Sequence, residues 1–126
     1  MAALRIEPAD DTPLIILNRE EERFEISGKS MPEDVIDFYQ PVLDWLASYR
    51  SAPLEKTIFD IRLIYFNTAS SKLLLDLLMI LEEIREQGHE VLVRWHSMTY
   101  DEDMQEAGRE YADMVDLDFE YLTYDK

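Results

Sequence analysis

The sequence predicts an α/β fold in one domain, with a mostly parallel five-stranded sheet packed by three helices. Two observations lead to this prediction. Short runs rich in β-branched and aromatic residues alternate along the chain with longer runs that carry apolar residues at helical spacing. The first two short runs follow each other directly and predict an N-terminal β-hairpin. The regular alternation after them is typical of parallel strands joined by right-handed crossovers.

Length and composition limit the class of protein. The 126 residues suffice for one domain over residues 1–126, and 47% hydrophobic residues with only three glycines indicate a compact fold. No apolar run reaches the roughly 18 residues that cross a bilayer, and the first residues lack the apolar core of a signal peptide. The absence of cysteine excludes thiol catalysis, disulfides and cysteine-bound metal. We therefore expect a cytoplasmic protein with no membrane insertion.

The formal net charge of −16 excludes one large class of partner. A nucleic-acid-binding protein needs a positive surface, and no basic stretch supplies one here. Residues 97–126 carry ten acidic residues against Arg109 and Lys126, which is half of the net charge. This acidic quarter has two interpretations: a solvated face that keeps the protein in solution, or a patch that docks on a basic partner.

The N-terminal part contains the hairpin and the first helix. Residues 1–13, with two prolines and an acidic pair, predict a loosely ordered lead-in. Leu14–Leu17 is apolar and Arg23–Ser27 alternates with period two, so these runs predict a hairpin at or near a sheet edge. Ser30, followed by proline and acidic residues, is typical of a helix cap, and Pro41 should kink the helix that follows.

The rest of the chain alternates strand and helix without an internal repeat. Runs of β-branched and aromatic residues predict buried strands, and longer runs of Leu, Met and Ile at helical spacing predict helices. The predicted elements are a strand from Ile58, a helix from about Ala69 to Gln87 that Gly88 ends, a strand over His89–His96, a helix over Met104–Met114 and a strand over Leu117–Tyr124.

The junction between the third strand and its helix combines local geometry with usable chemistry. The strand pattern ends at Asn67, and the helix opens directly after it, so the Thr68 hydroxyl lies at a helix N-terminus. Thr68 has two interpretations. It caps the helix by accepting hydrogen bonds from free amides, or it carries a phosphoryl group that the same amides and the helix dipole stabilise. Lys72 lies one turn on, and Ser70 and Ser71 are competing acceptors.

Other candidate sites have less support. The two histidines lie at opposite ends of one predicted strand, and their odd spacing places them on opposite faces, which argues against a shared metal. No paired nucleophile and base and no cofactor cradle is found, so we expect no catalytic residue, cofactor or metal. Arg62 and Arg94 lie inside apolar strands. Their position has two interpretations: ion pairs with Asp60 or Glu90, or contacts with an anion.

Three blocks of the sequence resemble the SiaC family of bacterial regulatory phosphoproteins. The blocks are Gly28–Glu33, Tyr65–Lys72 and Trp95 with Tyr100–Gly108. They occur in the family's order, and the middle block, which reads Tyr-Phe-Asn-Thr-Ala-Ser-Ser-Lys, is the most specific. Asp34 and Ala69 stand where the family pattern has Asn and Ser, and neither departure removes the Thr68 hydroxyl.

The resemblance implies a fold like that of the STAS domains, to which anti-anti-sigma factors belong. It also implies a partner switch, in which a serine/threonine kinase of the anti-sigma-factor type phosphorylates Thr68 and a PP2C-type phosphatase reverses the reaction. The unphosphorylated form then binds and activates a target, which for this family is a diguanylate cyclase in cyclic di-GMP and biofilm signalling. The implied switch surface comprises Tyr65, Asn67, Ala69, Ser70, Ser71 and Lys72.

A second hypothesis is an acidic interaction scaffold without phosphorylation, in which Thr68 is only a helix N-cap. Its binding to a basic partner would collapse at moderate salt, because exposed charges are screened. Expression beside the native kinase separates the two hypotheses, since only the switch gains the mass of a phosphoryl group. A small-molecule enzyme is a third hypothesis, for which the sequence supplies no site.

Overall fold

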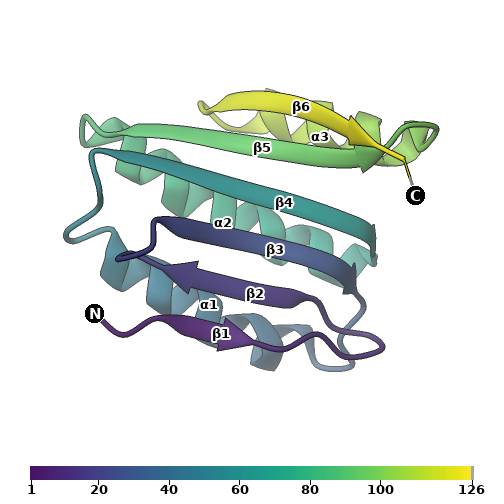
Figure 1. The fold of residues 1–126 in the computed structure, drawn as a ribbon, viewed down its shortest axis with the longest axis horizontal. Coiled ribbons are helices and arrows are strands. Elements are labelled where there is room, and N and C mark those ends of the chain that lie inside the picture. Colours follow the sequence, from purple (N-terminus) through teal and green to yellow (C-terminus); the bar gives the residue numbers. More distant parts are fainter. Residues whose placement is uncertain (126) are drawn as a thin grey trace.

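The structure, a computed structural model, describes residues 1–125 and forms one six-stranded sheet with three helices (Figure 1). Lys126 lies outside the described residues. It is the last residue both of the domain predicted over residues 1–126 and of the acidic quarter. The elements in chain order are β1 Leu4–Ile6, β2 Leu14–Asn18, β3 Arg23–Ser30, α1 Val35–Tyr49, β4 Lys56–Phe66, α2 Thr68–Glu86, β5 Glu90–Met98, α3 Glu102–Met114 and β6 Asp118–Tyr124.

The strands lie in the sheet in the order in which they occur in the chain. β1, β2 and β3 pair antiparallel, and β3, β4, β5 and β6 pair parallel, which confirms the predicted α/β fold. The predicted hairpin is β2–β3, where Leu14 lies opposite Ser27. The sheet has one strand more than the five expected. Leu4–Ile6, which the sequence placed in the lead-in, pairs with β2 as a short edge strand.

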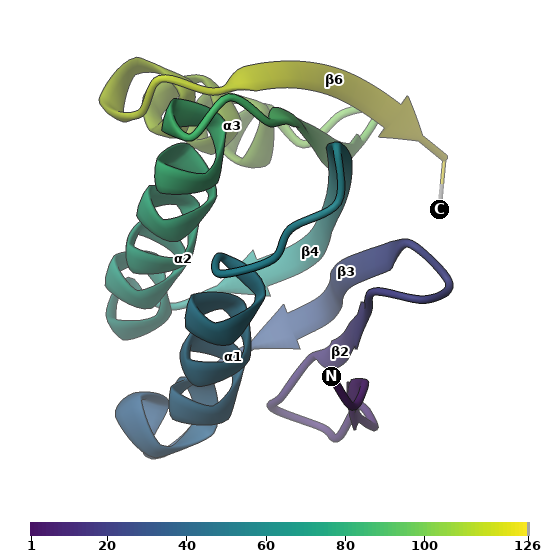
Figure 2. The same ribbon diagram turned by 90° about the vertical axis from the view of Figure 1, so that its left-hand side faces the viewer.

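All three helices pack against one face of the sheet, and the other face is left uncovered by helices (Figures 1 and 2). β4 shows the consequence, because Phe59, Ile61 and Leu63 are buried while Asp60 and Arg62 on the opposite face are not. The expectation that this strand is buried is therefore correct for one face only. Parallel strands are usually covered on both faces, so the open face is a distinctive feature of this molecule.

Helix starts differ from the prediction by a few residues. α1 begins at Val35 and is capped by Asp34, whose Oδ1 accepts a hydrogen bond from the Asp37 amide at 3.0 Å. The cap predicted at Ser30 is wrong, because β3 continues to Ser30, which pairs with Phe66 of β4. Tertiary strand pairing thus overrides a local cap signal that was chemically reasonable.

α3 packs closely on β5 where Trp95 meets Gly108. A Cβ atom at Gly108 would lie only 2.5 Å from Trp95 Cδ1, so the helix can approach this closely only with glycine there. The buried indole also donates a hydrogen bond from Nε1 to the Met104 carbonyl at 2.8 Å. Trp95 and Gly108 belong to the third block of the family resemblance, and the contact gives a physical reason for both.

Candidate functional site

The candidate site lies where β4 ends and α2 begins, at the carboxyl end of the parallel strands. Asn67 adopts an extended conformation and caps the helix, since its Oδ1 accepts a hydrogen bond from the Ser70 amide at 2.8 Å. Thr68 is the first residue of the helix. The prediction that Thr68 is the N-cap is therefore wrong by one residue, and so is the part of the scaffold hypothesis that gave Thr68 that role.

The Thr68 side chain is exposed, and none of the hydrogen bonds within residues 1–125 uses its hydroxyl. The neighbouring residue, Ala69, is exposed as well. An oxygen at this position lies beside the unpaired amides of the first helical turn and the positive end of the helix dipole. The site therefore suits a negatively charged group attached to Thr68.

Ser70 has a different environment, although it is only two residues from Thr68. It is fully buried, and its Oγ donates a hydrogen bond to the Ser30 carbonyl at 3.0 Å. Ser30 Oγ donates to Ser70 Oγ at 2.9 Å and lies 2.6 Å from the Tyr39 hydroxyl, which must then be the donor in that pair. Burial raises the pKa of Tyr39 to about 12, so the phenol stays protonated at neutral pH. This chain of hydroxyls ties α2 to β3 and α1.

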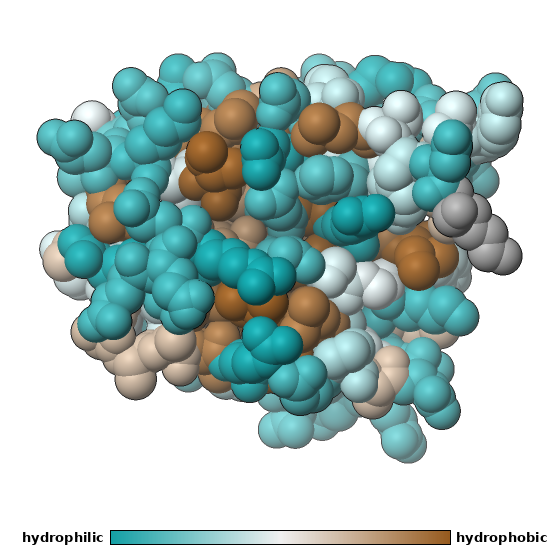
Figure 3. All heavy atoms as spheres, in the orientation of Figure 1, coloured by the Kyte–Doolittle hydropathy of each residue, from teal (hydrophilic) through white to brown (hydrophobic). Residues whose placement is uncertain are grey.

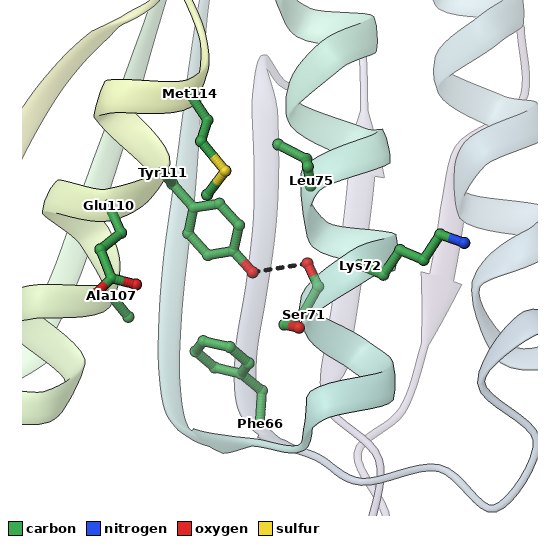
Figure 4. Close-up of a pocket in the computed structure, with 8 residues that line it drawn as sticks. All are labelled: Phe66, Ser71, Lys72, Leu75, Ala107, Glu110, Tyr111 and Met114. Atoms are coloured by element: carbon green, nitrogen blue, oxygen red, sulfur yellow. Dashed lines mark hydrogen bonds between the residues drawn. The ribbon is translucent and has the colours of Figure 1, made fainter.

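The first turn of α2 is also held from the α3 side. The Tyr111 hydroxyl donates to the Ser71 carbonyl at 2.7 Å (Figure 4). Within the turn itself, Ser71 Oγ donates to the Thr68 carbonyl at 2.6 Å. Burial of the phenol raises the pKa of Tyr111, which keeps this donor protonated. The Thr68 hydroxyl therefore stands on a turn that is fixed by neighbours on both sides.

Two hollows flank this turn. The α2–α3 hollow has a volume of about 300 Å³ and lies between the helices (Figure 4). Its lining is Phe66, Ser71, Lys72, Leu75, Ala107, Glu110, Tyr111 and Met114. The α1–α2 hollow, of about 470 Å³, lies on the other side of α2. Its lining is Val35, Ile36, Thr68, Ala69, Ser71, Lys72, Leu73 and Asp76.

The α1–α2 hollow is largely apolar and has Thr68 at its rim. Ile36, at its edge, is 64% exposed, which is unusual for a large aliphatic side chain. Lys72 lines both hollows, and its side chain points away from Tyr111 (Figure 4). Tyr65, at the end of β4, is 51% exposed. Exposed aliphatic and aromatic groups of this kind, in the hollow beside Thr68 and at the end of β4, have the character of a protein-binding surface.

The structure brings most of the predicted switch surface together. Ala69 and Lys72 are exposed and line the same hollow as Thr68, and Asn67 and Ser71 are partly buried. Tyr65 is exposed at the end of β4 and lines a separate hollow. Ser70 lies beneath the surface. The sequence did not identify Tyr39 or Tyr111, because each matches the apolar face of a helix and only the packing of that helix shows its second role. It also did not identify Ile36, whose exposure depends on how α1 packs.

Other residues that the sequence singled out have partners among the described residues. Arg94 pairs with Asp60 at 3.0 Å, as one interpretation predicted, and this hydrogen bond to the carboxylate raises the pKa of Arg94. His96 Nε2 lies 2.7 Å from the same carboxylate. Arg62 lies over the Tyr124 ring at 4.1 Å. Within residues 1–125 no three potential metal ligands gather, and no helix has the length and apolar character needed to cross a bilayer.

Comparison with known proteins finds relatives that span nearly the whole chain. The family model described as SiaC family regulatory phosphoprotein matches residues 6–124. An uncharacterized protein of Pseudomonas aeruginosa strain UCBPP-PA14 is 29% identical over 126 residues, which is 100% of both chains. Apo-SiaC from P. aeruginosa is similar in structure, with 28% identity, a TM-score of 0.87 and coverage of 98% of this chain and 100% of that one. The structure of the diguanylate cyclase SiaD in complex with its activator SiaC, from the same species, matches with 30% identity, a TM-score of 0.89 and coverage of 96% and 99%.

Proposed function

The chain belongs to the SiaC family of regulatory phosphoproteins, and from this premise we propose that it is a non-catalytic switch controlled by reversible phosphorylation of Thr68. The unphosphorylated form binds and activates a diguanylate cyclase. A kinase of the anti-sigma-factor type adds the phosphoryl group, and a PP2C-type phosphatase removes it. The similarity to a SiaC that is solved as the activator of the cyclase SiaD supports the choice of target.

The observation that carries the proposal is the division of roles at the start of α2. Asn67 supplies the cap, Ser70 is buried and the Ser71 hydroxyl is hydrogen-bonded, whereas the Thr68 hydroxyl is exposed. Of the three hydroxyls in this turn, Thr68 is therefore the one that a kinase can reach without unfolding the helix. Its position as first residue of α2 gives the phosphate a favourable electrostatic environment.

Phosphorylation acts on binding through charge and hydration. The phosphate adds about two negative charges at the rim of the α1–α2 hollow, next to Ile36 and Leu73. A partner that covers these apolar side chains in the unphosphorylated protein would have to strip water from the phosphate without offering it a counter-charge, which is unfavourable. The fold is unaffected, because no hydrogen bond of the helix start depends on the Thr68 side chain.

The test is the affinity for a diguanylate cyclase of the same organism. Thr68→Ala should bind as tightly as the wild type, and Thr68→Glu should bind at least about tenfold more weakly. Ser51→Glu is the matched control, because it adds the same charge at an exposed position beyond α1, away from the carboxyl end of β4. Equal binding by Thr68→Ala and Thr68→Glu would contradict the proposal.

The site of modification is tested separately, by intact mass after expression with the kinase. The wild type and Ser71→Ala should each gain one phosphoryl group, and Thr68→Ala should gain none. Modification that persists in Thr68→Ala would assign the acceptor to another hydroxyl. An acidic scaffold without phosphorylation predicts no gain in any variant and a binding reaction that is insensitive to Thr68.

A further inference from the structure

We infer that the target-binding surface continues from Thr68 around the carboxyl edge of the sheet onto its open face, where a hollow beside Lys29 and Arg62 takes an acidic, partly apolar segment of the partner. This inference rests on the proposed function, because it concerns the same diguanylate cyclase. The open-face hollow has a volume of about 650 Å³. Its lining is Lys29, Arg62, Ile64, Met98, Tyr124 and Asp125.

The first argument is that this face is available and is not purely polar. The helices all lie on the opposite side of the sheet (Figure 2), and apolar patches interrupt the polar surface of the open face (Figure 3). Ile64 is 44% exposed at the edge of the hollow. Tyr100 is 93% exposed in an adjoining hollow that shares Met98 and Tyr124 with it. Exposed aromatic and aliphatic groups of this kind provide the apolar part of a docking surface.

The second argument is charge. Most arginines in residues 1–125 have a carboxylate within 4 Å. These are Arg5, Arg23, Arg50, Arg85, Arg94 and Arg109. Neither Lys29 nor Arg62 has such a partner among the described residues, and Arg62 instead lies over the Tyr124 ring. The Asp125 carboxylate in the hollow accepts a hydrogen bond from Thr99 Oγ1 at 2.7 Å.

The hollow thus carries two cations against the single carboxylate of Asp125, which is notable in a protein with a net charge of −16. The bulk of the surface repels an acidic segment, and this hollow locally attracts one, so charge guides the segment to this place. The register of β3 against β4 shifts between Gly28 and Lys29, and Gly28 has a positive φ of 111°. Irregularities of this kind re-aim side chains near functional surfaces, and here the shift accompanies the placement of Lys29 at the hollow.

The third argument is continuity with the surface around Thr68. Ile64 also lines a hollow with Tyr65 and Phe66 at the strand ends. Phe66 in turn lines the α2–α3 hollow, and Lys72 lines both the α2–α3 and the α1–α2 hollows. Each hollow therefore shares at least one lining residue with the next, from Thr68 to the open face. A stable interface covers about 800 Å² on each partner, which is more than a single hollow provides.

The test compares two exposed lysines, one in the open-face hollow and one outside it. Lys29 and Lys56 are both exposed, lie in neighbouring strands and have no carboxylate within 4 Å in the described part of the chain. Lys29→Glu should weaken binding to the cyclase by about tenfold at low salt, and Lys56→Glu should change it little. The difference in affinity between the two variants should become smaller as salt is raised, because salt screens the interaction between charges. Arg62→Gln should weaken binding in the same direction.

The outcomes separate this inference from the proposed function. If the wild type binds and both Lys29→Glu and Arg62→Gln bind as Lys56→Glu does, the open-face contact is wrong and the switch at Thr68 stands. If the wild type does not bind the cyclase, both are overturned. If Lys29→Glu leaves cyclase binding unchanged but abolishes self-association, the hollow serves a second copy of the chain and the inference is likewise overturned.

Discussion

Asn67 and Thr68 are adjacent in sequence but have opposite surroundings. The Asn67 side chain faces the first turn of α2 and satisfies the Ser70 amide. The Thr68 side chain faces solvent at the rim of an apolar hollow. Because Asn67 supplies the cap, a group attached to the Thr68 hydroxyl would leave the hydrogen bond from the Ser70 amide intact. In the proposed switch, this separation of roles lets phosphorylation of Thr68 change the surface alone.

This separation leads to a stability prediction. Asn67→Ala should lower the free energy of unfolding by about 1 kcal/mol, the usual cost of losing a cap. Thr68→Ala should change it by less than about 0.5 kcal/mol, as is typical of exposed positions. Urea unfolding of the two variants measures the difference directly. A larger loss from Thr68→Ala than from Asn67→Ala would return the capping role to Thr68.

At the scale of elements, α3 is placed by its contact with β5 and in turn supports α2. Gly108 lets the helix approach Trp95, and Tyr111, one turn further on, donates to the Ser71 carbonyl of α2. The position of the α2–α3 hollow therefore depends on a glycine far from Thr68 in sequence. A change in the packing of α3 should therefore move the first turn of α2, which carries Thr68, through this hydrogen bond.

Gly108→Ala tests this packing, because helix propensity and steric overlap predict opposite changes in the free energy of unfolding. In an unobstructed helix the substitution gains about 1 kcal/mol. Here the new methyl group would overlap the Trp95 ring, so we expect a loss of about 1–3 kcal/mol in the free energy of unfolding. In a double-mutant cycle, Trp95→Phe should recover part of that loss by making room. Gly108→Ala at least as stable as the wild type would contradict the close packing of α3.

For the whole molecule, buried phenols should lower the free energy of unfolding at alkaline pH. Burial raises the pKa of Tyr39 to about 12, and that of Tyr111 is raised by the same cause. The folded state therefore holds these protons more tightly than the unfolded chain, in which tyrosine ionises near pH 10. Their contribution is complete below about pH 10 and is lost as the pH rises towards 12.

Equilibrium unfolding between pH 9 and pH 12 should show this loss, with Tyr39 alone contributing up to about 3 kcal/mol. Tyr39→Phe should be less stable at neutral pH, because Ser30 loses its hydroxyl partner. Its stability should nevertheless fall less steeply than that of the wild type above pH 10. Parallel pH profiles for the two proteins would show that Tyr39 does not titrate in this way.

Much of the fold could be predicted from local patterns. Alternating residues in Arg23–Ser27 and helical spacing after Thr68 identified the hairpin and the long helix, because these periods depend only on which residues meet the core. Leu4–Ile6 was missed, since three residues carry too little pattern to predict a strand and β1 exists only by pairing with β2. The cap at Ser30 was wrong for a related reason, because pairing with β4 extends β3 through it.

The sequence alone determined the order of the elements that follow β1, the absence of a basic stretch and, by resemblance, the family and the candidate acceptor Thr68. These follow from composition, periodicity and short motifs, which are local properties of the chain. Only the tertiary structure decided that Asn67 rather than Thr68 caps α2, that Ser70 is buried, and that the sheet keeps one open face with Lys29 and Arg62 at its edge. Side-chain exposure and neighbours depend on how distant elements pack, and local sequence does not contain that information.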